Sequence, residues 1–188
     1  MAEDDDLNYP LIALLTLETH GRDFNTDHIA DQWLKLLPAG RVYTAERIVY
    51  RNLLDGVPAL EVGSLNNPFK EWIGALIRTD VYGWVNPGNI KLAAQMAYRD
   101  AWLSHRRNGL YGAAMSAAMC AAAMVTTDIE EVLDAGMMVL PPESEIFKAC
   151  KFARELGNSH DDYETVLDKL YDYVDGMHWV HTVNNAAS

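Results

Sequence analysis

Four consecutive acidic residues precede the first apolar segment of the chain. They are Glu3, Asp4, Asp5 and Asp6, and the apolar segment begins at Tyr9. Carboxylate oxygens are the ligands that hard cations such as Mg²⁺ prefer, and adjacent acids at a helix start can converge on one ion. Acids are also stabilised there by the partial positive charge of a helix N-terminus. The run therefore indicates either a divalent-cation site or a solvated acidic cap.

A second group of polar residues follows a helical pattern in the middle of the chain. His105 ends that pattern, and Asn108 and Gly109 come directly after two arginines. Asn and Gly readily adopt positive φ, so we predict a tight turn here. A histidine at this place either satisfies the helix end or contacts a ligand. Tyr111, beside the turn, could cover a ligand ring, whereas the arginines are most simply solvated.

Other candidates carry weaker signals. His178 and His181 are three residues apart, a spacing that suits a metal, but no third ligand stands nearby and packing explains them equally. Cys120 and Cys150 lie in helical patterns without metal or redox spacing. We therefore expect a reduced intracellular compartment, the cytoplasm.

The central stretch 67–124 must position most of these residues. Asn67 is a candidate N-cap with Pro68 as the first helical residue, and turns at 86–88 and 106–109 separate two further helices. The last helix, about 110–125, is rich in alanine and apolar all round, as expected of a buried helix at the centre of a bundle. Sixteen residues reach only about 24 Å, too short for a bilayer core of about 30 Å.

Short amphipathic helices are predicted on both sides of this stretch. Gly21 ends the first, Thr44 is an N-cap candidate for the third, and Asp128 and Ser144 cap two later ones. The predicted ranges are about 9–20, 26–37, 45–55, 129–135, 145–156 and 161–174, followed by the opening of one more helix after 178. No segment alternates as a strand, so we predict one all-α domain over residues 1–188, a compact multi-helix bundle.

Composition limits the classes of partner. The chain has 188 residues, 49% of them hydrophobic, and a formal net charge of −12. A sizeable core is expected, whereas general electrostatic binding of nucleic acid is disfavoured. No run is long enough to cross a membrane, and no secretory signal opens the chain.

Several stretches together resemble the ADP-ribosylglycohydrolase family, in particular a prokaryotic branch of it. They are DDLNY (5–9), TAER (44–47), NPFKEWIGA (67–75), IRTDVYG (77–83), PG (87–88), YRDA (98–101), SH (104–105), NGLYG (108–112) and HWVHTVNNAA (178–187). Together they extend over essentially the whole chain.

The resemblance implies an all-α bundle in which two Mg²⁺ ions position a water that attacks the anomeric carbon of an ADP-ribosyl group. Asp4, Asp5 and Asp6 match the first acidic metal motif, so the resemblance assigns them to the metal and gives Asp5 and Asp6 a catalytic role. The substrate-binding positions that it implies are Gly74, Arg78, Asp80, His105, Asn108, Gly109 and Tyr111. We expect the acids and the turn after His105 to face each other across one pocket.

The chain also departs from the family pattern. Relatives usually begin with a glycine-rich helix and end with a second Asp-x-Asp-Thr motif, and neither is present here. Asp4 replaces a threonine, Leu76 replaces a glutamine and Trp102 replaces a serine. We therefore expect an incomplete bundle with at most a partial Mg²⁺ site, weak Mg²⁺ affinity and little turnover by this chain alone.

Two functions remain open from the sequence. The first is a metal-dependent hydrolase of ADP-ribosyl or related ribosyl bonds. The second is a catalytically inactive remnant or fragment that binds an ADP-ribose-like ligand or a protein partner. The expected partners are an ADP-ribose-like small molecule or an ADP-ribosylated protein, and self-association or a completing chain is a further expectation.

Overall fold

A computed structural model of the chain describes residues 5–159 and 162–188. The described residues contain no β-strand and are predominantly helical. The α-helices are α1 (Asp5–His20), α2 (Thr26–Leu36), α3 (Thr44–Leu54), α4 (Asp80–Trp84), α5 (Ile90–Ala101), α6 (Asn108–Ala123), α7 (Ile129–Met138), α8 (Glu145–Gly157), α9 (Tyr163–Tyr173) and α10 (Thr182–Ala187). Three 3₁₀ helices join them: η1 (Gly21–Asp23), η2 (Ala39–Arg41) and η3 (Ile73–Arg78). The all-α prediction is confirmed.

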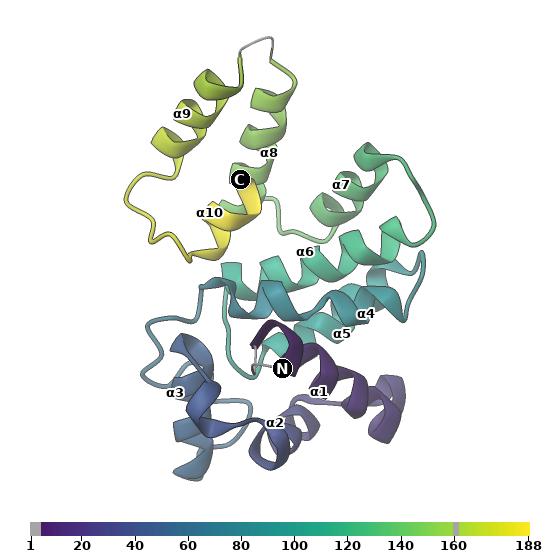
Figure 1. Ribbon diagram of the computed structural model, residues 1–188, viewed down its shortest axis with the longest axis vertical. Helices are drawn as coiled ribbons and strands as arrows, with labels where there is room; N and C mark the ends of the chain where they lie inside the picture. The colour runs from purple at the N-terminus through teal and green to yellow at the C-terminus, as the bar shows by residue number, and fades with distance from the viewer. Residues whose placement is uncertain (1–4, 160–161) are drawn as a thin grey trace.

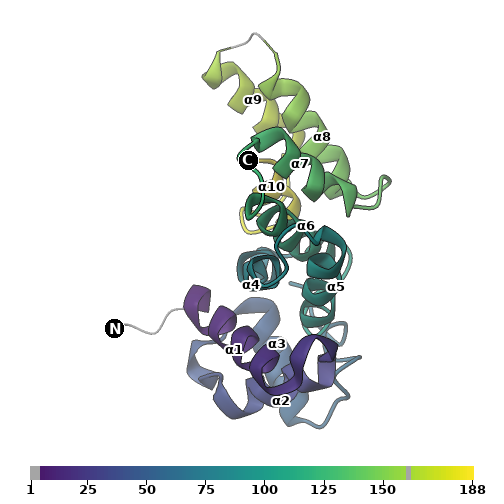
Figure 2. The same ribbon diagram turned by 90° about the vertical axis from the view of Figure 1, so that its right-hand side faces the viewer.

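The helices form an elongated molecule (Figures 1 and 2). Helices α1, α2 and α3 lie at one end, α4, α5 and α6 cross the middle, and α8 and α9 extend to the other end. The final helix, α10, returns to pack against α8, the first part of α6 and η3. No helix of the described chain combines the length and apolarity needed to cross a bilayer.

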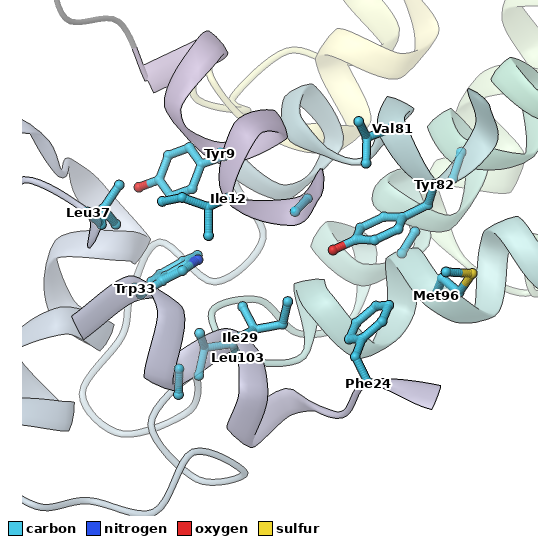
Figure 3. Packing of buried hydrophobic residues seen from close by; sticks show 14 of the residues in the cluster. Tyr9, Ile12, Phe24, Ile29, Trp33, Leu37, Val81, Tyr82, Met96 and Leu103 are labelled. Carbon is cyan, nitrogen blue, oxygen red and sulfur yellow. The ribbon is translucent and has the colours of Figure 1, made fainter. Parts of the chain in front are cut away.

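The alanine-rich helix α6 joins the two main hydrophobic clusters. Ala117 and Ala121 belong to the cluster built by α1, α2, α4 and α5, which Figure 3 shows around Trp33 and Tyr82. Met115 belongs to the cluster built by α8, α9 and α10. Eleven residues of α6 are buried. The prediction of a buried central helix is therefore confirmed.

Several local signals also act as the sequence predicts. Gly21 follows α1 with a φ of +66°, a conformation that glycine adopts without steric cost. Asp128 and Ser144 accept hydrogen bonds from backbone N–H groups in the first turns of α7 and α8. Thr44 differs, because it is the first residue of α3 and the N-cap is Tyr43.

The predicted helix start at Asn67 and Pro68 is wrong. The Asn67 carboxamide oxygen accepts from Phe69 N–H at 3.1 Å, and its Nδ2 donates to the carbonyls of Gly63 and Ser104. These bonds stabilise a local turn in place of a helix. Regular hydrogen bonding begins only at Ile73, as the short helix η3, and α4 follows after Thr79.

Candidate functional site

A hollow of about 320 Å³ lies where the first half of α1, the start of α3, η3 and the loop before α10 meet. We call it the aromatic cleft. Its lining residues are Tyr9, Tyr43, Thr44, Glu46, Trp72, Ile73, Gly74, Ile77, His178, Trp179 and Val180. Two larger hollows, beside α7, contain none of the residues that the sequence predicted as functional.

Aromatic rings form much of the cleft wall. The two segments that supply them are joined by a backbone hydrogen bond. The ring of Trp72 stacks on His178, with centroids 4.5 Å apart and an interplanar angle of 13°. Ile73 N–H donates to the Val180 carbonyl at 3.0 Å, which joins the loop before α10 to η3. Trp179 is 75% exposed, so its ring can still contact a ligand.

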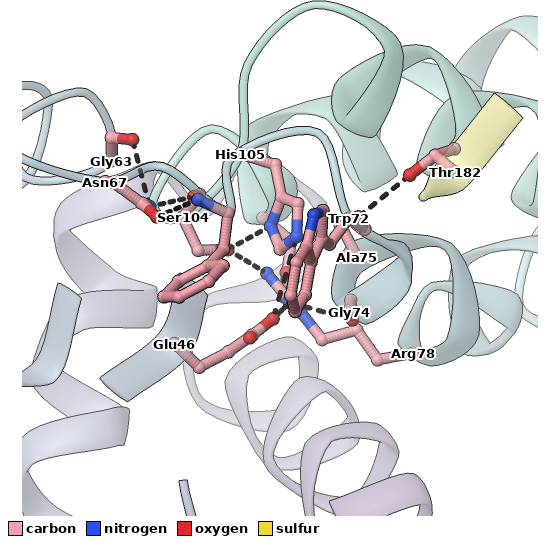
Figure 4. A network of polar contacts seen from close by, with 12 residues as sticks. Glu46, Gly63, Asn67, Trp72, Gly74, Ala75, Arg78, Ser104, His105 and Thr182 are labelled. Atoms are coloured by element: carbon pink, nitrogen blue, oxygen red, sulfur yellow. Dashed lines mark hydrogen bonds and ion pairs between the residues drawn. The ribbon is translucent and has the colours of Figure 1, made fainter. Parts of the chain in front are cut away.

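Beneath the cleft lies a group of buried polar side chains, which Figure 4 shows in part. We call Glu46, Arg78, Asp100, Ser104 and His105 the buried cluster. Arg78 is its centre: Nη1 donates to Glu46 Oε1 at 2.8 Å, Nε to Asp100 Oδ1 at 2.9 Å, and Nη2 to Ser104 Oγ at 2.8 Å. Nη1 also donates to the Gly74 carbonyl at 3.0 Å. One guanidinium therefore joins α3, η3 and α5.

Arg78 is 1% exposed, and its surroundings explain how the charge is retained. Its guanidinium carbon lies 5.2 Å from the ring centroid of Tyr9 and 5.1 Å from that of Trp33, so aromatic faces also contact the cation. Burial alone would lower the pKa of Arg78, but the charges of Asp100 and Glu46 outweigh it and the pKa is raised. Arg78 is thus a permanent internal cation.

His105 is fully buried and neutral. Burial, followed by the charge of Arg78, lowers the pKa of His105 well below its ordinary value, against an opposing effect of the Trp72 backbone. Its Nδ1 lies 2.7 Å from Ser104 Oγ, a hydroxyl that also accepts a hydrogen bond from Arg78. Its Nε2 lies 3.9 Å from Glu46 Oε1, which is beyond hydrogen-bond distance.

The turn after His105 does not line the aromatic cleft. Asn108 and Tyr111 border a separate hollow of about 250 Å³ at the start of α8. Asn108 Nδ2 donates to Glu71 Oε2 at 2.7 Å, and its Oδ1 accepts from Ile146 N–H at 3.2 Å. In the described structure the turn and Tyr9 of α1 border different hollows. Because Asp4 and the side chain of Asp5 are not described, the expectation that the acids and the turn share one pocket stays a prediction. A substrate role for Asn108 and Tyr111 stays a prediction.

Gly109 is required for a reason that the sequence did not reveal. It belongs to the first turn of α6, and Arg107 is the residue with positive φ, at 50°. A Cβ at position 109 would lie 2.6 Å from the Lys70 carbonyl oxygen and 2.8 Å from His105 Cδ2. Gly109 therefore allows a close approach between α6 and the segment that leads to the cleft.

Of the three acids predicted to bind a metal, the structure describes the side chain of Asp6. Asp4 and the side chain of Asp5 lie outside the described structure, and Asp6 is exposed in the first turn of α1, just before Tyr9 of the cleft. Within residues 5–159 and 162–188, no group of three or more His, Cys, Asp or Glu side chains could hold a metal ion. The metal assignment to Asp4, Asp5 and Asp6 therefore stays a prediction.

Asp80 lies away from the cleft at the start of α4. It is partly buried, and burial raises the pKa of its carboxyl, against a hydrogen bond from Val81 N–H that lowers it. Asp80 also raises the pKa of the Cys120 thiol, after burial, which places its charge beside α6. Its substrate role stays a prediction.

Sequence reasoning did not identify Glu46, Asp100 or Ser104 as members of one group. A signal was present, because Glu46 and Asp100 occupy buried positions in amphipathic helices, where an acid needs a cationic partner. Arg78 is the corresponding cation. What the sequence could not show is that helices from three parts of the chain place these side chains together.

Comparison with known proteins gives one match. A family model described as ADP-ribosylglycohydrolase matches residues 4–188. The matched range contains the cleft, the buried cluster and the start of α1. No curated protein and no solved structure matches the chain.

Proposed function

The chain belongs to the ADP-ribosylglycohydrolase family, and from this premise we propose that it hydrolyses ADP-ribosyl or related ribosyl glycosidic bonds, with the aromatic cleft holding the ribosyl group. The family match over residues 4–188 is the observation that carries this proposal. The cleft supports it, because a hollow of about 320 Å³ next to ordered polar groups can hold a sugar and its reacting bond.

In this proposal the described residues bind and position the ribosyl group. Trp72 and Trp179 offer apolar ring surfaces to one face of a sugar or base. Arg78 keeps the Glu46 carboxylate and the Gly74 carbonyl in fixed positions at the cleft floor. In hydrolysis the bond from the anomeric carbon to the leaving group breaks, the electron pair and a proton go to the leaving group, and water supplies the new oxygen.

Mg²⁺ dependence is a separate part of the proposal. Asp4, Asp5 and Asp6 are hard oxygen donors at the start of α1, one turn before a residue of the cleft, and a bound divalent cation would supply Lewis-acid activation of water there. The described side chains alone do not make a metal centre, so no step of the reaction is assigned to the ion.

The experiment is an ADP-ribose release assay on an ADP-ribosylated protein, with Mg²⁺ and with EDTA. Release that requires Mg²⁺ and falls in Asp5→Asn and Asp6→Asn supports the whole proposal, with Asp31→Asn, an exposed acid on α2, as the control. Release that survives EDTA and both substitutions retains the hydrolase and removes the metal site. Binding of ADP-ribose without release supports the non-catalytic alternative.

A further inference from the structure

A hollow of about 420 Å³ lies among α6, α7, α8 and α10 (Figure 1). We call it the sulfur pocket, because four of its lining side chains contain sulfur: Met115, Met119, Met137 and Cys150. They come from three helices, α6, α7 and α8. Among the described residues, the sulfur pocket shares none with the aromatic cleft. It is therefore a separate hollow, and its donor atoms are soft.

Cys150 and Met115 already have the separation that a shared metal ion requires. Cys150 Sγ lies 4.0 Å from Met115 Sδ and 3.5 Å from the Ala186 carbonyl oxygen. A metal–thiolate bond is about 2.3 Å long, so two sulfurs that bind one ion at a trigonal angle lie about 4 Å apart. Cys150 and Met115 are both 8% exposed and border the hollow, so a small ion can reach them.

Met119 supplies a second thioether beside Met115. The two residues are four apart in α6, and side chains at that spacing lie on one face of a helix. A Cβ on Gly136 would lie 2.9 Å from Met119 Sδ and 3.1 Å from Met115 Cγ, so both methionines pack against the same glycine of α7. Methionine adapts readily because it has three rotatable bonds. Met119 can therefore turn its sulfur toward an ion held by the other two residues.

The charged side chains at the sulfur pocket pair with one another toward solvent. Arg154 Nη2 lies 2.5 Å from Glu130 Oε2, and its Nη1 lies 2.7 Å from Asp134 Oδ1. The side chains of Glu130 and Asp134 are 59% and 66% exposed. Solvent therefore screens these charges, and the sulfur atoms are the donors closer to the core.

These donors suit a soft ion with a single positive charge. Thiolate and thioether sulfur are ligands of Cu(I), whereas Mg²⁺ and Ca²⁺ take oxygen ligands. Structural Zn²⁺ takes four Cys or His ligands, but the described lining has one cysteine and no histidine. Burial raises the pKa of the Cys150 thiol to about 11, because apolar surroundings disfavour the thiolate charge. A Cu(I)–thiolate pair is neutral, whereas a divalent ion would bring a net charge into the hollow.

We propose that Cys150, Met115 and Met119 form a binding site for Cu(I). When the ion binds, the S–H bond of Cys150 breaks, its electron pair forms the Cu–S bond, and the proton goes to solvent. Each thioether donates a lone pair and loses no proton, and the oxidation state of copper does not change. Cu(I) binding is independent of the proposed hydrolysis, because the two sites have no described residue in common.

The first experiment offers Cu(I) to the full chain as its bicinchoninate complex, without oxygen and with ascorbate as reductant. The absorbance of the complex falls as the chain takes the ion. We expect transfer of one ion per chain and, because the thiol is protonated at neutral pH, release of about one proton. Excess Zn²⁺ should leave the transfer unchanged. No transfer, or transfer that Zn²⁺ prevents, would overturn the proposal.

Variants assign the transferred ion to the sulfur pocket. Cys150→Ser should lower the affinity for Cu(I) at least about tenfold, since loss of a mere partner of a ligand already costs that much. The double variant Met115→Leu with Met119→Leu should lower it by a similar factor, and leucine replaces methionine with little change of volume. Full affinity in the double variant would overturn the proposal, because a lone thiol would then explain the binding.

Two control variants change sulfur atoms elsewhere. Cys120 packs against Gly83 on another face of α6, and Met138 is exposed on α7. In Cys120→Ser and Met138→Leu the affinity should stay within about twofold of the wild-type value. Binding that depends on Cys120 instead of Cys150 would contradict the proposed site.

NMR of the wild-type chain locates the ion without any substitution, so the test survives a variant that circular dichroism shows to be unfolded. The chain is labelled with ¹³C at the methionine methyl groups, and Ag⁺, a soft cation of the same charge, is added. The methyl signals of Met115 and Met119 should shift, and that of Met138 should stay in place. Unchanged signals of Met115 and Met119 would overturn the proposal.

Discussion

Arg78 connects residues that are far apart in the sequence, because its guanidinium contacts Glu46, Gly74, Asp100 and Ser104. Removing it deprives two buried carboxylates of the guanidinium that they share, and removal of one partner is the costly way to break an internal ion pair. We expect Arg78→Met to lower the free energy of unfolding by about 3–5 kcal/mol. Urea denaturation followed by circular dichroism measures the change.

Arg51→Met is the matched control for this prediction, because Arg51 is exposed in the last turn of α3. Its effect should stay within about 0.5 kcal/mol, as for most surface substitutions. Equal effects of the two substitutions would show that the contacts of Arg78 contribute little net stability.

His105 should make stability depend on pH. Its pKa in the folded chain is lowered well below the ordinary value of about 6.5, first by burial and then by Arg78. When the pH falls below that ordinary value, the unfolded chain binds a proton at His105 that the folded chain does not bind. The free energy of unfolding therefore decreases as the pH falls. The slope from this one group approaches about 1.4 kcal/mol per pH unit.

Urea denaturation of the wild-type chain and His105→Asn over a pH series tests this prediction. The variant should lose less stability than the wild type as the pH falls below neutrality. Burial also lowers the pKa of His181, against the charge of Glu71, but His181 is present in both proteins and its contribution cancels. Parallel pH profiles would mean that the folded chain protonates His105 as easily as the unfolded chain does.

At the residue scale, the sequence singled out Arg78 and His105 correctly as unusual side chains. It did not show that they are buried. Arg78 and His105 were assigned to the substrate from the resemblance, and both are fully buried beneath the cleft. Spacing in a sequence identifies a polar exception on a helix, but it does not say whether that side chain faces a ligand or another helix. A contact of either residue with substrate stays a prediction.

At the scale of elements, the first turn of α6 packs closely against the backbone of the segment before η3. Gly109 lies under the Lys70 carbonyl, and a methyl group there would have to move backbone or the ring of His105. We expect Gly109→Ala to lower the free energy of unfolding by about 1–3 kcal/mol, as overpacking does in cores. Chemical denaturation measures it.

Gly157→Ala provides the comparison, because a Cβ at the end of α8 would meet no atom within 4 Å. Alanine has the higher helix propensity, so this variant should be neutral or more stable by up to about 1 kcal/mol. Both substitutions add the same methyl group to a helical glycine, and the surroundings of that methyl group differ. Equal destabilisation would mean that helix geometry, and not the Lys70 contact, selects glycine at position 109.

Helix caps were predictable because they depend on neighbours in the sequence. Asp128 and Ser144 each bond a backbone N–H two or three residues later, and residue type alone predicts that bond. The segment after Asn67 was not predictable in the same way. Its amide group bonds to the carbonyl of Ser104, which is 37 residues away. A local sequence pattern cannot reveal a long-range hydrogen bond that favours a turn over a helix.

The whole molecule depends on α6, which contributes to the clusters at both ends. Most of its alanines are buried, so the exposed apolar side chains of this region are instead Met124, Val125, Ile129 and Met138, on the chain after α6 and on α7. Self-association stays a prediction, and these residues are the part of the surface on which it would depend.

A shared helix predicts that the two ends unfold together. Ile146 is fully buried in the cluster of α8, α9 and α10, whereas Trp33, one of the five tryptophans, is buried in the cluster at the opposite end. A variant that keeps Trp33 as its single tryptophan makes the fluorescence specific to that end. We expect Ile146→Ala to lower stability by about 2–5 kcal/mol and to shift the tryptophan fluorescence and circular dichroism transitions equally.

Coincident transitions in urea would confirm the prediction of one domain over residues 1–188, because loss of packing at α8 would then be felt around Trp33. A fluorescence midpoint that stays in place while the circular dichroism transition splits would show two folding units that meet at α6. In that case the Arg78–Glu46 pair would belong to the unit built from α1–α5, whereas the cleft would lie between the two units, because His178, Trp179 and Val180 of the loop before α10 also line it.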